Sequence, residues 1–102
     1  VNKSTSDALE ESLENYSIEE STSSNLAYWK EYSEGEEISD NMVVASYINK
    51  TIRYYEIRSG RFTQESTQKI RREISDYRKI NNGRIDKGII EAMIKEFGHS
   101  SQ

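Results

Sequence analysis

Apolar residues recur at intervals of three and four in three stretches between residues 44 and 97, and this spacing is the strongest constraint on the fold. Such intervals place side chains on one side of a helix. Gly60 separates the first stretch from the second, and Asn81-Asn82-Gly83 separates the second from the third, as helix stops and turns do. The stripes are Val44, Ile48, Ile52 and Tyr55, then Ile70, Ile74 and Tyr77, then Ile90, Met93, Ile94 and Phe97. No alternating run indicates a sheet. The sequence therefore predicts an all-α fold, a small three-helix bundle.

Polar residues at the expected helix starts define the boundaries. Ser39 is the predicted N-cap of the first helix, which should end near Gly60. Thr63 is the predicted N-cap of a helix over residues 64–80, and Asp86 that of a third helix, which Gly98 should end. We therefore expect a basic three-helix domain over residues 38–98 and a frayed tail over residues 99–102.

Charge divides the chain into two unlike parts. Residues 1–40 hold eleven acidic and two basic residues, a net charge of −9, whereas residues 41–102 hold twelve basic and seven acidic residues, a net charge of +5. Hydrophobic residues make up only 33% of the chain, so not all of it is expected to be buried. Residues 1–37 are interpreted as an acidic arm rich in Ser and Glu, partly helical, and either disordered or docked.

Two apolar clusters in the arm are candidate docking elements. Leu9 and Leu13 fall on one face of a short helix that needs a partner surface. Leu26, Trp29 and Tyr32 fall on one side of a second short helix, expected to end near Gly35. Because large aromatic side chains gain free energy on leaving water, we expect this second cluster to dock on the rest of the chain or on a partner.

Sequence motifs for catalysis or cofactor binding are absent. The chain contains no cysteine and no proline, and its single histidine, His99, lies in the polar tail. It has no nucleophile elbow, calcium-binding loop or glycine-rich phosphate loop. No apolar run reaches the length of about eighteen residues that a membrane span needs. We expect no catalytic activity, no cofactor or metal, no small-molecule substrate and no membrane partner.

Arginines and one tyrosine form the candidate binding set. A guanidinium donates two parallel hydrogen bonds to a phosphate or a carboxylate, so this set suits a nucleic acid or an acidic protein. Glu73 and Asp76 lie within the same region and would weaken a track of phosphate contacts. The candidates are Arg53, Tyr54, Arg58, Arg61, Arg71, Arg72 and Arg78.

Two short stretches have partial resemblances. Residues 51–56, "TIRYYE", resemble the end of the reading helix in MerR-type transcription regulators, and residues 57–62, "IRSGRF", resemble the end of small excisionase-type winged helices. Both families place a helix-turn-helix upstream, with a glycine turn between its helices. The residues before Thr51 contain no such turn and predict one continuous helix, so neither a fold nor base-contacting residues are carried over.

Together these features predict a non-catalytic helical module for protein–protein interaction and assembly within a larger nucleic-acid-associated protein or complex. Its partner would be another protein, with a second copy of the chain, giving a homodimer, as one candidate. The alternative is direct binding of DNA or RNA through the basic helical surface, modulated by the acidic arm. An intracellular location, cytoplasmic or nuclear, is expected. Because the chain begins with Val1, we expect it to be a piece of a longer protein or a processed product.

Overall fold

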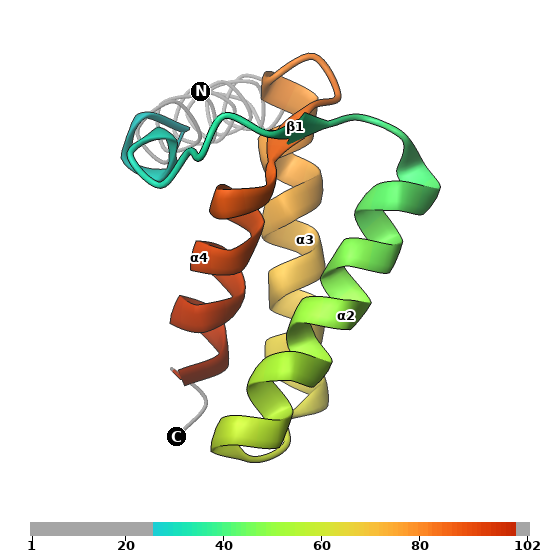
Figure 1. The fold of residues 1–102 in the computed structure, drawn as a ribbon, viewed down its shortest axis with the longest axis vertical. Coiled ribbons are helices and arrows are strands. Elements are labelled where there is room, and N and C mark those ends of the chain that lie inside the picture. The colour runs from blue at the N-terminus through green and yellow to red at the C-terminus, as the bar shows by residue number, and fades with distance from the viewer. Residues whose placement is uncertain (1–25, 100–102) are drawn as a thin grey trace, which may run out of the picture.

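The computed structural model describes residues 26–99, so the predicted docking residues Leu9 and Leu13 lie outside the described part. Three helices stand side by side along the molecule, α2 (Asn41–Ser59), α3 (Gln64–Ile80) and α4 (Lys87–His99) (Figure 1). The all-α bundle predicted from the apolar stripes is confirmed. None of the helices in this part of the chain has the length and apolar character needed to cross a bilayer.

Local capping explains where the helices begin and end. Asp40, and not Ser39 as predicted, is the N-cap of α2, since its carboxylate accepts hydrogen bonds from the backbone N–H groups of Met42 and Val43. Thr63 caps α3 as predicted, with Ser66 N donating to its hydroxyl at 3.0 Å. Gly60, at a φ of 97°, follows the end of α2. Both bonds to Asp40 go to the same oxygen, Oδ1, and the negative charge of the carboxylate is favourable at a helix N-terminus.

The core lies between the three helices, where α4 packs against both α2 and α3. The predicted apolar stripes supply most of it, and Ile85 and Ile89 add to it. The fully or nearly buried hydrophobic residues are Trp29, Val44, Ile48, Ile52, Ile70, Ile74, Tyr77, Ile85, Ile89, Ile90, Met93 and Ile94. Gly98, which was predicted to end the third helix, lies inside α4 instead. The ring of Phe62 occupies the space that a side chain at this position would need.

A two-residue antiparallel ladder, not expected from the sequence, joins the segment just before α2 to the segment just before α4. β1 (Glu37–Ile38) pairs with β2 (Ile85–Asp86), with Glu37 opposite Asp86. Residues 26–30 are helical and lie at the same end of the molecule (Figure 1). This helix stops at Lys30 in a tight turn, earlier than the predicted end near Gly35. Two-residue strands carry no detectable alternation, which is why the sequence pattern missed them.

The carboxylate of Asp86 fastens residues 33–36 to the start of α4. One oxygen accepts from Ser33 Oγ and from the N–H groups of Gly35 and Glu36, at 2.8–2.9 Å. The other accepts from the N–H groups of Glu34 and Gly88, at 2.8 and 2.7 Å. Asp86 is only 1% exposed, and these donors replace the water that a buried carboxylate would otherwise lose. Asp86 is thus the N-cap predicted for the third helix, and it also binds a distant loop.

Removing this carboxylate should destabilise the fold. Asp86→Ala leaves four backbone N–H groups without their acceptor, so we expect the free energy of unfolding to fall by roughly 2–4 kcal/mol. Urea denaturation followed by circular dichroism measures the change. Asp76→Ala, an exposed aspartate on α3, is the control and should change stability by less than about 0.5 kcal/mol. Equal effects of the two substitutions would show that Asp86 holds nothing together.

Acid should release the same contact. Burial alone would raise the pKa of Asp86, but the hydrogen bonds from Glu34, Gly88, Ser33 and Glu36 outweigh it and hold the pKa below its usual value of 3.8. A carboxyl with a depressed folded-state pKa stabilises the fold above its unfolded pKa, and that stability is lost as pH falls through the folded-state value. We expect wild-type stability to drop below about pH 4. The same titration of Asp86→Asn should show a smaller drop in this window.

Candidate functional site

Two of the predicted basic residues, Arg78 and Arg71, donate hydrogen bonds to other parts of the chain, so the full set does not form one free binding surface. The guanidinium of Arg78 donates to the carbonyl oxygens of Gly83 and Ser39 and to Asn41 Oδ1, at 2.7–3.0 Å. It therefore fastens the end of α3 to the turn that follows it and to the start of α2. We interpret Arg78 as a structural residue, a role that depends on chain segments 37 to 39 residues away and leaves no local sequence signal.

Arg71 links the middle of the bundle. Its Nη2 donates to Asn49 Oδ1 at 2.6 Å, which connects α3 to α2. A shallow hollow of about 450 Å³ lies at this junction, and its lining includes Asn49, Arg53 and Arg71. Arg72, one residue further along α3, is exposed, and its side chain has no hydrogen bond or ion pair within residues 26–99.

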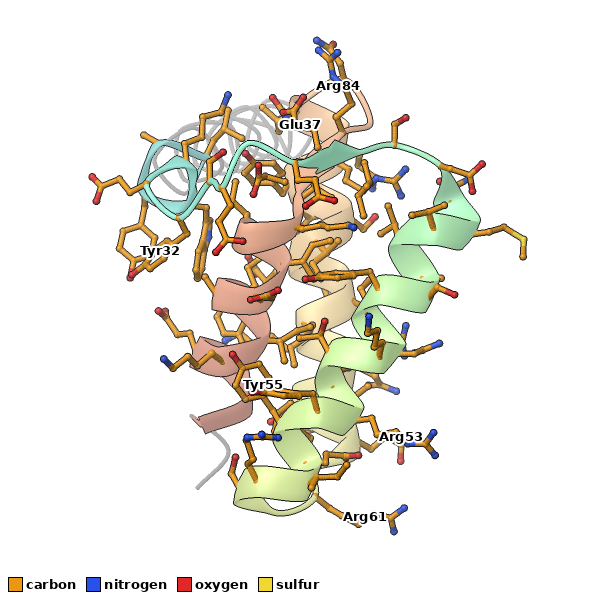
Figure 2. All side chains as sticks on the ribbon, viewed as in Figure 1. Tyr32, Glu37, Arg53, Tyr55, Arg61 and Arg84 are labelled. Carbon is orange, nitrogen blue, oxygen red and sulfur yellow. The ribbon has the colours of Figure 1, made fainter. Side chains whose placement is uncertain are left out.

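The end of α2 presents the remaining candidates, which together with Ile57 we call the arginine face (Arg53, Tyr54, Ile57, Arg58 and Arg61). Tyr54, Ile57 and Arg58 have the three- and four-residue spacing that puts them on one side of α2. Ile57 is 76% exposed and Tyr54 is 49% exposed. The side chains of Arg53 and Arg61 point away from the bundle at the same end of α2 (Figure 2). Sequence reasoning missed Ile57, although its position off the core stripe was readable.

The charges of the arginine face are almost uncompensated. Residues 50–61 contain four bases, Lys50 and the three arginines of the face, and one acid, Glu56. Glu56 is half-buried and its carboxylate accepts from the N–H of Phe62 at 3.1 Å. The guanidinium of Arg58 lies 3.9 Å from the centre of the Tyr54 ring, a cation–π contact that orients both side chains.

The predicted docking residues of the arm lie against α4. Trp29 is 3% exposed and belongs to the core, and its ring meets that of Phe97 at a centroid distance of 5.8 Å. Leu26 packs against the same cluster. Tyr32 remains 43% exposed while its ring contacts that of Trp29. In the described part, the end of the acidic arm is therefore attached to the bundle through Trp29.

A groove lies between this attached segment, α4 and α2, and we call it the carboxylate groove. It has a volume of about 540 Å³, and it is lined by Tyr32, Glu34, Tyr55, Gly88, Glu91, Ala92, Lys95 and Glu96. Figure 2 shows Tyr55 extending from α2 toward α4. Gly88 has no side chain because the carbonyl oxygen of Tyr32 and the side chain of Glu34 occupy that space. Sequence reasoning missed this close approach, although a glycine inside the first turn of a helix, where no stop is needed, is a signal that could have found it.

Tyrosine hydroxyls hold two carboxylates of the groove. The Tyr47 hydroxyl donates to Glu91 Oε2, and the Tyr28 hydroxyl donates to Glu96 Oε1 at 3.2 Å. Burial raises the pKa of Tyr47, and this contact with Glu91 raises it further to a smaller extent. A hydrogen bond with Tyr32 and the negative charge of Glu96 contribute to raising the pKa of Tyr28 to about 12. Within residues 26–99, no cluster of three or more His, Cys, Asp or Glu side chains is arranged to hold a metal ion.

The hydroxyl of Tyr47 should contribute measurably to stability. Tyr47→Phe removes the hydrogen bond to the half-buried Glu91, so we expect a loss of about 1 kcal/mol. Tyr54→Phe is the matched control, because the hydroxyl of Tyr54 has no hydrogen bond within residues 26–99. Because the folded-state pKa of Tyr47 is raised, its contribution is complete below about pH 10 and is lost as pH rises through the folded-state value. Urea denaturation at pH 7 and pH 11 tests both statements, and equal losses in the two variants would contradict them.

No protein family, curated protein or solved structure matches the chain.

Proposed function

We propose that this chain is a non-catalytic helical module for protein–protein interaction and assembly, and that it binds an acidic surface of a partner through the arginine face. The module would work within a larger nucleic-acid-associated protein or complex. The observation that carries the proposal is the exposure of Ile57 and Tyr54 among arginines at one end of α2.

Exposed apolar side chains among arginines have the composition of a protein interface. Interfaces are enriched in tyrosine and arginine, and a large aliphatic side chain that is 76% exposed loses its contact with water when a partner covers it. A solvated helix face of the ordinary kind would carry polar residues at these positions. The arginines add specificity, because each guanidinium group can donate two parallel hydrogen bonds to one carboxylate.

Direct nucleic-acid binding is the second candidate, and the exposed arginines favour it. The side chains of Arg53, Arg61 and Arg72 have no hydrogen bond or ion pair within residues 26–99, so their donors are available to phosphates. Two observations weigh against it. Arg78 donates three hydrogen bonds inside the molecule, and an apolar side chain such as Ile57 gains little from a phosphate backbone.

Charge reversal on the arginine face should abolish partner binding. We expect proteins that the wild-type chain captures by affinity purification to be lost with the double substitution Arg58→Glu and Arg61→Glu, because two attractive contacts become repulsive. Lys79→Glu, an exposed base at the end of α3, is the control and should retain the captured proteins. Quantitative mass spectrometry of the three samples measures the difference, and equal recovery from all three would exclude the arginine face as the interface.

A salt series distinguishes direct nucleic-acid binding from the proposed protein binding. Fluorescence anisotropy with labelled duplex DNA and single-stranded RNA reports direct binding, which must weaken steeply as salt rises because bound phosphates release counterions. Steep salt dependence that the same double substitution removes would replace the protein-binding proposal with nucleic-acid binding. Weak binding without this dependence would eliminate the alternative.

A further inference from the structure

The arginine face and the carboxylate groove have opposite charge and adjoin each other on α2. Tyr54 belongs to the face and Tyr55 lines the groove. A hollow of about 340 Å³ whose lining includes Tyr54, Tyr55 and Glu91 connects the two surfaces. We propose that the acidic partner of the arginine face is a second copy of this chain, which offers its carboxylate groove. This inference rests on the proposed function and names its partner.

The groove carries an excess of negative charge that is available for contact. Its lining contains three carboxylates, those of Glu34, Glu91 and Glu96, and one base, Lys95. The Tyr47 and Tyr28 hydroxyls each occupy one oxygen of Glu91 and Glu96, so the second oxygen of each has no partner within residues 26–99. The side-chain carboxylate of Glu34 has none there either. The tyrosine hydroxyls hold the carboxylates of Glu91 and Glu96 in place, so their second oxygens are oriented acceptors for the planar guanidinium of an arginine.

The walls and floor of the groove suit the apolar part of the arginine face. Ala92 from α4 and the ring of Tyr55 from α2 provide the apolar part of the floor. The space above Gly88 is already filled by the carbonyl oxygen of Tyr32 and the side chain of Glu34. The ring of Tyr32, 43% exposed, stands on the opposite wall. A protruding side chain such as Ile57, or the aliphatic stem of Arg58, therefore meets apolar surface at the floor and carboxylates at the rim.

The adjacency of the two surfaces sets the symmetry of the pair. In a two-fold dimer the same two patches meet twice, since the face of each copy contacts the groove of the other. Because Tyr54 and Tyr55 are neighbours on α2, both contacts lie close to one axis and form together. The dimer would then bury the apolar side chains of both faces at once.

Complementary charge reversals test this contact in the full chain. Sedimentation velocity over a concentration series should show wild-type dimers that weaken as salt rises. Arg58→Glu and Glu34→Lys, each alone, place like charges in both contacts, and we expect the dimer dissociation constant to rise by about tenfold or more. An equimolar mixture of the two variants should regain wild-type affinity, because each contact again pairs opposite charges.

The mixture also controls for misfolding, since an unfolded variant cannot restore the dimer. Lys79→Glu and Asp76→Lys, on the exposed side of α3, should leave dimerisation unchanged, alone or mixed. A wild-type chain that stays monomeric at millimolar concentration, or a mixture that stays monomeric, would overturn the self-association proposal. If partners are still captured through Arg58 and Arg61 in that case, the arginine face binds another acidic protein and the proposed function stands.

Discussion

The end of the molecule where residues 33–36 meet the start of α4 depends on the buried carboxylate of Asp86. The ladder between β1 and β2 has only two residues in each strand, which is too short to hold a loop by itself. Asp86 adds charge-assisted hydrogen bonds from residues 33–36 to its capping bond with Gly88. Two ion pairs at the surface, Lys87 with Glu36 at 2.8 Å and Arg84 with Glu37 at 3.7 Å (Figure 2), contribute less because solvent reaches and screens them. The carboxylate of Asp86 therefore fixes residues 33–36, and the burial of Trp29 at the same end supplies apolar stabilisation.

The same contact determines the shape of the carboxylate groove. By fixing the N–H groups of Glu34 and Gly35, Asp86 positions the backbone that carries Tyr32 and Glu34 over α4. Gly88 then allows the carbonyl oxygen of Tyr32 to approach α4 without a clash. One wall of the groove thus comes from the arm and the other two from the bundle. The carboxylate groove therefore exists only while the arm is attached, whereas the arginine face needs only α2 and the turn that follows it.

The helices could be predicted from the sequence because their signals are local. The stripes of α2, α3 and α4, the cap at Thr63 and the stop at Gly60 each occupy one continuous stretch. The ladder and the Asp86 contact could not be predicted, because they join residues about fifty positions apart.

The residues of the candidate site also fall into a predictable and an unpredictable group. Arg53, Tyr54, Arg58 and Arg61 are near neighbours and were predicted as a group, whereas the internal role of Arg78 and the lining of the groove arise only when distant segments meet.

The long sequence separation of the Asp86 contacts also bears on the order of folding. A loop of about fifty residues must close before Ser33 or Glu36 can reach Asp86, and such closure costs more entropy than the short turn between α2 and α3. The contacts of α2, α3 and α4 can form first, since they need only short connections. We therefore expect the Trp29 segment to attach last during folding and to detach first during partial unfolding, so that the nascent bundle exposes the apolar surface of α4 before the arm covers it.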